Sequence, residues 1–232
     1  MANDGANDGA NDVVRVLAFD VNETLLDLAA LDPLFASALG DAALRPQWFS
    51  SMLQLAFVGG LTGNYVDFTS AQRAALRMTA ARAGRVVSDQ AVDDIVGAMS
   101  QLPAHPDVPA ALERLRAAGF RVTALTNSVL AVARAQLTYA GLIGLFDAVF
   151  SADEVRALKP APAPYRMVAE RSDVGIGEVR LVAAHAWDVS GALAAGCRAA
   201  FVARGGVVPS PLGAQPDVVG ADLGEIADAL VR

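Results

Sequence analysis

An aspartate at the end of an apolar segment is the residue of this chain best suited to chemistry. Asp20 follows Val16-Leu17-Ala18-Phe19 and opens the segment Asp20-Val21-Asn22-Glu23-Thr24. A carboxylate at the end of a buried strand lies where open parallel α/β sheets place their active sites, and there it can act as a nucleophile. The position two after Asp20 is held by Asn22 and not by a second acid.

The rest of the chain alternates between strand-like and helix-like patterns. Apolar segments predict strands at 13–19, 120–125, 148–150, 179–183 and 199–202, the last that the sequence predicts. Helices are predicted at 110–118, 165–171, 190–195 and 223–231, and a further helix follows the segment 126–128 and ends at 139. This alternation predicts an α/β fold with a Rossmann-like, doubly wound parallel sheet. The polar segments around Asp20, Thr126 and Asp188 follow three of these strands and should meet in one crevice.

The segment between the first two predicted strands shows helical patterns only. Helices are predicted at 35–39, 46–57, 70–83 and 88–99, with Ser88 as an N-cap. We therefore expect a helical cap at 29–104 inserted after the first strand. The α/β core is expected at 13–28 and 105–232. Residues 1–12 repeat Ala-Asn-Asp-Gly and are predicted to form a disordered tail.

Four of these features together resemble the haloacid dehalogenase superfamily. Its four motifs match, in chain order, Asp20 with Thr24, then Thr126, Lys159 and Asp188. The resemblance covers nearly the whole chain after the tail. Members that cleave phosphate esters carry a second acid, their proton donor, where this chain has asparagine.

Further segments are similar to the L-2-haloacid dehalogenase branch of this superfamily. Residues 48–68 align without gaps to the first cap helices of that branch, and Tyr165 lies at its spacing after Lys159. The segment 186–188 (Ala-Trp-Asp), followed by Gly191-Ala192, matches its fourth motif. Trp187 in this motif either contributes to the site or packs in the core.

The resemblance implies a two-step hydrolysis at the α-carbon of a short 2-haloacid. Asp20 would displace the leaving group with inversion and form an ester on its own side chain; water would then hydrolyse the ester and release a 2-hydroxy acid. Lys159 would keep Asp20 ionised, since a nearby opposite charge lowers a carboxyl pKa. Asp188 would orient or deprotonate the water, or hold Lys159, and the sequence does not separate these roles.

The resemblance also implies residues that bind the substrate. Thr126 would bind the substrate carboxylate through its hydroxyl group, with help from the backbone N–H groups of Val21 and Asn22, because turn amides commonly bind anions. The remaining positions are Asn127 and Phe68, which match the branch's halide cradle, and Tyr165, which would form a hydrogen bond near the carboxyl groups.

Several residues depart from the branch pattern, and two of them, Phe49 and His185, bear directly on the chemistry. Directly after the tryptophan of its second cap helix the branch has an arginine that contacts the leaving halide, and this chain has Phe49 there. Losing one preorganised donor can cost about 10²–10³ in rate, so Phe49 predicts a weakened dehalogenase or a different leaving group. Arg45 is not expected to replace the arginine, because Pro46 intervenes. His185 replaces an asparagine and would donate to the leaving group, help activate water or serve a structural role.

The composition limits the partners of the protein. The 232 residues are 54% hydrophobic and 19% charged, enough to bury a core. The net charge of −7 without a basic stripe argues against nucleic acid, and no apolar run is long enough for a membrane span. Cys197 is the only cysteine and no signal-peptide pattern is present, so we expect a cytoplasmic protein.

We therefore predict an (S)-2-haloacid dehalogenase-like hydrolase whose partner is a small carboxylic acid. The branch needs no metal and no cofactor is expected, although Asp20 and Asp188 leave a hard-cation site open. One alternative is a hydrolase of this fold that acts on a C–N bond α to a carboxylate or on a phosphate ester. The other is a non-catalytic binding protein, which the intact acids and lysine disfavour. A homodimer through Leu53, Leu55 and Phe57 is predicted by analogy.

Overall fold

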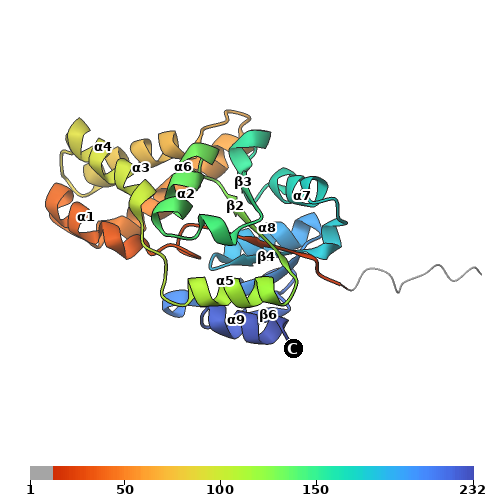
Figure 1. Ribbon diagram of the computed structural model, residues 1–232. Helices are drawn as coiled ribbons and strands as arrows, with labels where there is room; N and C mark the ends of the chain where they lie inside the picture. Colours follow the sequence, from red (N-terminus) through yellow and green to blue (C-terminus); the bar gives the residue numbers. More distant parts are fainter. Residues whose placement is uncertain (1–12) are drawn as a thin grey trace, which may run out of the picture.

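A six-stranded parallel sheet organises the chain, which the computed structural model describes over residues 13–232. The strand order is β3-β2-β1-β4-β5-β6 (Figure 1). The predicted α/β fold with a doubly wound sheet is confirmed, and the tail predicted at 1–12 lies outside the described residues. The strands are β1 (Val16–Phe19), β2 (Arg121–Thr126), β3 (Ala148–Ser151), β4 (Val179–Ala183), β5 (Arg198–Val202) and β6 (Val218–Gly220).

Both faces of the sheet are buried under helices. In β1 the side chains of Leu17 and Phe19 join one apolar cluster, and those of Val16 and Ala18 join a second, as the two-residue period of a strand requires. Figure 1 shows α5 and α9 side by side along one face. The first cluster contains residues of α5 (Val108–Ala117), α6 (Leu130–Tyr139) and α9 (Leu223–Leu230), and the second those of α7 (Pro162–Arg171) and α8 (Ala186–Ala195).

The described chain between β1 and β2 forms helices and no strand of the sheet. Figure 1 shows the first four α-helices of this segment gathered on one side of the sheet, whereas the fifth, α5, lies along its face. Asp67 and Ser88 cap α3 and α4, each accepting a backbone N–H from three residues further on. Among residues 13–232, no helix is both long and apolar enough to cross a bilayer. The four helices are α1 (Asp32–Leu39), α2 (Leu44–Leu61), α3 (Phe68–Arg82) and α4 (Asp89–Ala98).

Several predicted element boundaries are wrong, and one strand was not predicted. The first strand begins at Val16 rather than at Val13. Helix α8 begins at Ala186 rather than at Ser190, so Asp188 lies in its first turn and not in a loop; the helix dipole favours a carboxylate there. Strand β6 was not predicted, because an edge strand of 3 residues is too short to show a two-residue alternation.

Gly191 allows α8 to lie against the loop that carries Lys159. A Cβ atom at Gly191 would lie 2.5 Å from Cβ of Pro160, 2.8 Å from its carbonyl oxygen and 2.7 Å from the hydroxyl oxygen of Tyr165. These distances are shorter than van der Waals contact and one of the atoms belongs to the backbone, so a methyl group here must push α8 away. The missing side chain therefore brings Asp188 close to Tyr165 and Lys159.

We expect Gly191→Ala to lower the free energy of unfolding by about 1–3 kcal/mol, the usual cost of overpacking, as measured by urea denaturation. Gly97→Ala in α4 is the matched control, since a Cβ atom there would meet nothing within 4 Å. Because alanine is the better helix former, this control should stabilise the protein by about 0.5–1 kcal/mol. Equal stability of Gly191→Ala and the native chain would contradict the close approach of α8.

Candidate active site

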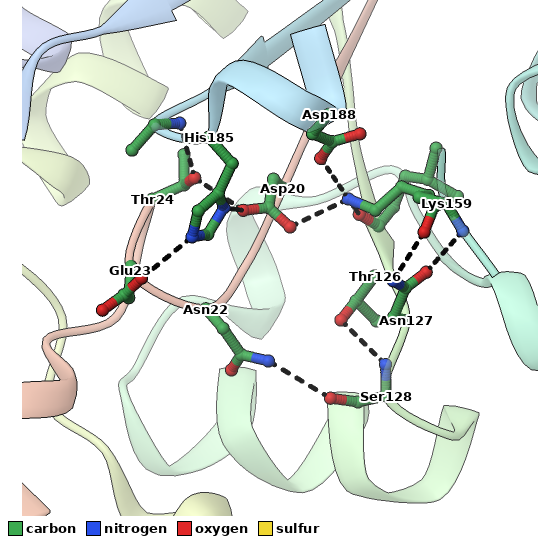
Figure 2. Close-up of polar contacts among 12 residues, drawn as sticks. Asp20, Asn22, Glu23, Thr24, Thr126, Asn127, Ser128, Lys159, His185 and Asp188 are labelled. Atoms are coloured by element: carbon green, nitrogen blue, oxygen red, sulfur yellow. Dashed lines mark hydrogen bonds and ion pairs between the residues drawn. The ribbon is translucent and has the colours of Figure 1, made fainter. Parts of the chain in front are cut away.

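Asp20 lies at the carboxyl end of β1 with both carboxylate oxygens hydrogen-bonded (Figure 2). Oδ1 accepts from Nζ of Lys159 at 2.8 Å, and Oδ2 accepts from Oγ1 of Thr24 at 2.7 Å. Thr24 Oγ1 itself accepts the backbone N–H of Ala184 at 2.9 Å, which directs its hydrogen toward Asp20. Burial would raise the pKa of Asp20, but the positive charges of Lys159 and His185 outweigh it and hold the pKa well below its ordinary value.

The ammonium group of Lys159 joins two buried aspartates. Its Nζ donates to Oδ1 of Asp20 at 2.8 Å, to Oδ2 of Asp188 at 2.6 Å and to the carbonyl oxygen of Leu125 at 2.8 Å. These bonds use all three N–H donors of a lysine. Burial would lower the pKa of Lys159, but Asp188 and Asp20 outweigh it and raise the pKa. Lys159 is therefore a fixed positive charge.

Asp188 is fully buried in the first turn of α8. Its Oδ1 accepts a hydrogen bond from the hydroxyl group of Tyr165 at 2.6 Å. Burial raises the pKa of Asp188 and outweighs the attraction of Lys159, while the charge of Asp20 raises the pKa further. A carboxylate with a raised pKa is suited to accept a proton from water.

His185, the N-cap residue of α8, connects Asp20 to Glu23. Nδ1 lies 3.1 Å from Oδ2 of Asp20, and Nε2 lies 2.9 Å from Oε2 of Glu23; Figure 2 shows the ring between the two carboxylates. Burial would lower the pKa of His185, but hydrogen bonds and charge interactions with Asp20 and Glu23 raise it to about 10. The ring is therefore an imidazolium at neutral pH, and both nitrogens donate.

Buried N–H and O–H donors without an acceptor lie next to Asp20. The backbone N–H groups of Val21 and Asn22 are buried and donate no hydrogen bond to any group in residues 13–232. Such orphaned donors are rare inside proteins. Oγ1 of Thr126 accepts the backbone N–H of Ser128 at 3.1 Å, which leaves its own hydrogen free to donate. The three donors are suited to an anion.

Within residues 13–232, no three His, Cys, Asp or Glu side chains group in a way that could hold a metal ion. The donor set agrees with this finding, because Nζ of Lys159 stands between Asp20 and Asp188 at 2.8 and 2.6 Å. A divalent cation held by both carboxylates would have to displace this ammonium group.

Comparison with known proteins identifies the group to which this chain belongs. The family model of the haloacid dehalogenase-like hydrolases matches residues 14–196. (S)-2-haloacid dehalogenase 1 of Pseudomonas sp. (strain CBS-3) is 32% identical over 187 residues, which cover 80% of this chain and 82% of the relative. The chain belongs to the haloacid dehalogenase-like hydrolases, in the branch of the (S)-2-haloacid dehalogenases.

Solved structures of this branch share the fold. L-2-haloacid dehalogenase from Xanthobacter autotrophicus superposes with a TM-score of 0.87 at 27% identity, covering 94% of this chain and 98% of the other. The structure of that protein with chloropropionic acid covalently bound gives a TM-score of 0.86 at the same identity and coverage.

The side chains of Asn127 and Phe68, which the sequence predicts to face the substrate, contact protein groups in this hydrolase, and so does the side chain of Asn22, for which only the backbone N–H was predicted to bind substrate. Asn127 holds the backbone of Lys159, donating to its carbonyl oxygen at 3.2 Å and accepting its N–H at 2.8 Å. The Asn22 side chain contacts Ser128 at 3.4 Å and Gln136 at 3.0 Å. Phe68 is 2% exposed and belongs to the first apolar cluster, the one that contains Leu17 and Phe19. The side chains of Asn127 and Asn22 therefore hold the segments at the strand ends in place.

Phe49, which stands at the position of the branch arginine, packs on His185. The two ring centroids lie 5.7 Å apart with an interplanar angle of 19°. Arg45 lies one turn earlier in α2, where Nε pairs with Asp32 at 2.5 Å and NH1 lies 3.7 Å from Glu23. Among the described residues Arg45 forms no ion pair with Asp20, so the positive charges beside Asp20 come from Lys159 and His185.

Glu23 is the residue of the site that sequence reasoning missed. It directly follows Asn22 in the first motif, but nothing in the sequence indicates that its side chain faces His185. Its backbone has a φ of +62°, a left-handed conformation that is uncommon for a residue other than glycine. The turn after β1 thus directs the Glu23 carboxylate toward His185.

We expect His185→Asn to lower stability in a pH-dependent way. Because folding raises the pKa of His185 from 6.5 to about 10, the folded protein keeps a proton that the unfolded chain releases. This contribution is present below about pH 6.5 and is lost as the pH rises toward 10. The difference in unfolding free energy between the native chain and the variant should shrink by at least about 1 kcal/mol between pH 6 and 9, as measured by urea denaturation.

His105→Asn is the matched control for this measurement. Burial lowers the pKa of His105, so its neutral form is favoured in the folded state and its contribution to stability rises with pH. The two variants should therefore show pH dependences of opposite sign. A stability difference for His185→Asn that stays constant with pH would contradict the imidazolium.

Proposed function

We propose that this hydrolase displaces halide from the α-carbon of a short (S)-2-haloacid and releases the 2-hydroxy acid through an ester on Asp20. The observation that carries the proposal is the ionised, buried Asp20, held at 2.8 Å from the ammonium group of Lys159. The relatives support it, since they are named (S)-2-haloacid dehalogenases and one solved structure holds chloropropionic acid covalently.

The hydrogen bonds of Asp20 favour Oδ1 as the attacking oxygen. A carboxylate oxygen offers about two lone-pair positions. Oδ2 accepts hydrogen bonds from both Thr24 and His185, and these two bonds occupy both of its lone-pair positions. Oδ1 accepts only from Lys159. Oδ1 therefore keeps a lone pair that can form a bond to carbon, and Oδ2 becomes the carbonyl oxygen of the ester.

In the first step, Oδ1 forms a bond to the α-carbon while the carbon–halogen bond breaks and halide leaves with the electron pair. The substrate carboxylate is bound by the hydroxyl group of Thr126 and the backbone N–H groups of Val21 and Asn22, whose hydrogens have no acceptor in the described residues. The indole N–H of Trp187, buried and without a partner there, is a donor for the departing halide. Inversion at carbon follows from attack opposite the leaving group.

In the second step, water attacks Cγ of the ester and passes a proton to Asp188, whose raised pKa suits this role. Negative charge forms on Oδ2. The intermediate collapses by breaking the bond between Cγ and Oδ1, and the product alkoxide takes the proton from Asp188. Asp20 regenerates its carboxylate by releasing the remaining water proton, so the net products are the hydroxy acid, halide and a proton.

We propose that residues 29–104 form a cap over the core at 13–28 and 105–232. Two ring contacts from α2 support this division: Phe49 stacks on His185, and Phe57 meets Trp187 edge-on at 5.3 Å. Both partners in the core belong to the start of α8. A cap closed here excludes water during the first step, when water would compete with Asp20.

We also propose a cytoplasmic enzyme that forms a homodimer through α2. The only cysteine, Cys197, is buried and unpaired, as in a reducing compartment.

The dimer surface predicted from the sequence included Leu53, which is only 8% exposed. Val58 and Leu61, further along α2, are 49% and 88% exposed and are the better candidates for a contact between two copies. Cleavage of a phosphate ester is not favoured, since the amide of Asn22 cannot act as a general acid.

We expect the purified, metal-free enzyme to release chloride from (S)-2-chloropropionate and not from the R enantiomer, as measured by a halide assay. Asp20→Asn should reduce the rate by at least about 10⁴-fold, the scale expected on removal of a nucleophile. Asp228→Asn, which alters an exposed aspartate paired with Arg114, is the matched control and should retain activity. Full turnover by Asp20→Asn would rule out the covalent route, and release that requires an added metal would contradict the role of Lys159.

A further inference from the structure

The line Asp20–His185–Glu23 places a cation on the side of Asp20 opposite to Lys159 (Figure 2). The buried centre then holds two acids, Asp20 and Asp188, and two bases, Lys159 and His185, so that its charges balance. Glu23 lies at the outer end of this line, with its side chain 34% exposed. The imidazole of His185 is only 12% exposed and depends on these two carboxylates for its polar contacts.

The rings around His185 also suit a cation. Phe49 stacks on one side at 5.7 Å between centroids, and Trp187 stacks at 5.2 Å with an interplanar angle of 28°. Aromatic faces attract a cation placed over them. An arginine at position 49 would instead bring a like charge beside the imidazolium. Phe49 and His185 therefore form a matched pair, in which the positive charge comes from α8 rather than from α2.

His185 contacts the oxygen on which charge develops during ester hydrolysis. Nδ1 lies 3.1 Å from Oδ2 of Asp20, and Oδ2 becomes an oxyanion when water attacks the ester formed at Oδ1. Thr24 donates to the same oxygen at 2.7 Å. Preorganised donors at a developing oxyanion typically contribute about 10²–10³ in rate, and a charged donor contributes more than a neutral one.

We propose that Glu23 is a positioning residue that keeps His185 as an imidazolium, and that this ion stabilises the oxyanion formed on Asp20 during ester hydrolysis. The inference rests on the proposed function and deepens it, because it assigns the imidazolium to the second step. Thr24 and His185 together form the oxyanion hole, and Glu23 acts through His185 without touching the substrate.

Other charged groups face His185 and Glu23 across a cavity of about 200 Å³. Arg45 approaches Glu23 to 3.7 Å, whereas Arg204 is held by Asp107 at 2.9 Å. Asp27 and His105 line the same cavity. The two arginines oppose protonation of His185 and Asp27 favours it, but Glu23 is the carboxylate of this cavity that contacts the ring.

The first test follows the ester directly with (S)-2-chloropropionate, using rapid quenching and intact-protein mass spectrometry. We expect Glu23→Gln to form the ester within about threefold of the native rate and to hydrolyse it at least about 10-fold more slowly near pH 9. The deficit should shrink near pH 6, where His185 becomes protonated without Glu23. A purely structural role for Glu23 would instead slow both steps at every pH.

Glu23→Asp and Asp27→Asn are the controls. The shorter acid should restore part of the hydrolysis rate, because it keeps a negative charge near His185. Asp27→Asn removes a carboxylate of the same cavity that does not touch the ring, and it should slow ester hydrolysis far less than Glu23→Gln does. Ester hydrolysis by Glu23→Gln at the native rate across the pH range would overturn the proposal.

The second test measures the charge of His185 without any substrate. The chain contains 2 histidines, so ¹⁵N-histidine labelling gives two imidazole spectra, and His105→Gln assigns them. We expect His185 to remain an imidazolium above pH 8 and its pKa to fall by at least about one unit in Glu23→Gln. An unchanged pKa would overturn the proposal even if the native chain is a dehalogenase. If the native chain forms no ester, the proposed function fails and the role in hydrolysis with it, whatever the titration shows.

Discussion

The architecture of the site depends on one ammonium group buried between two aspartates. Nζ of Lys159 joins Asp20, at the end of β1, to Asp188, in the first turn of α8. Removing one member of such a buried set leaves an uncompensated charge and is strongly destabilising. Two uncharged groups also hold Lys159 in place. The carbonyl oxygen of Leu125 accepts the third hydrogen bond of the ammonium group, and Asn127 forms hydrogen bonds with both the N–H and the C=O of the Lys159 backbone. The geometry of catalysis is thus maintained by the same contacts that join three elements of the fold.

A second cation, His185, lies beside Asp20 in this hydrolase. The family resemblance predicts an arginine at position 49, but this chain has Phe49 there, and the positive charge comes from His185 at the N-cap of α8. Asp20 and Glu23, which flank the turn after β1, hold this cation by direct contact with its two ring nitrogens. Halide departure loses a charged donor by this change, whereas the ester gains one at its carbonyl oxygen. The exchange favours the second chemical step over the first.

The sequence predicted the sheet, and the meeting of its polar strand ends, for physical reasons that apply locally. Buried parallel strands are continuous apolar runs, and the polar residues that end them must meet at one edge, so Asp20, Thr126 and Asp188 were found from the pattern alone. Lys159 and Tyr165 lie in a loop and a helix between strands, and only the family resemblance indicated them. Strand β6 was missed because its 3 residues carry too little pattern.

Glu23 could not be predicted, since its role depends on a left-handed backbone conformation and on a ring that lies 162 positions further along the chain. The same limit applies to Asn127 and Asn22, whose side chains hold the backbone and neighbouring side chains. The family resemblance predicted that both residues belong to the site. Which group each side chain contacts follows from tertiary packing, which no local pattern encodes.

The central claim is that the oxygen of the product comes from Asp20. A single turnover with enzyme in excess over (S)-2-chloropropionate in H₂¹⁸O tests it most directly, with mass spectrometry of the product and of the peptide that contains Asp20. The covalent route predicts an unlabelled hydroxy acid and one ¹⁸O atom in the Asp20 carboxylate. A labelled product with an unlabelled Asp20 would mean that water attacks the substrate directly, and it would contradict a nucleophilic role for Asp20.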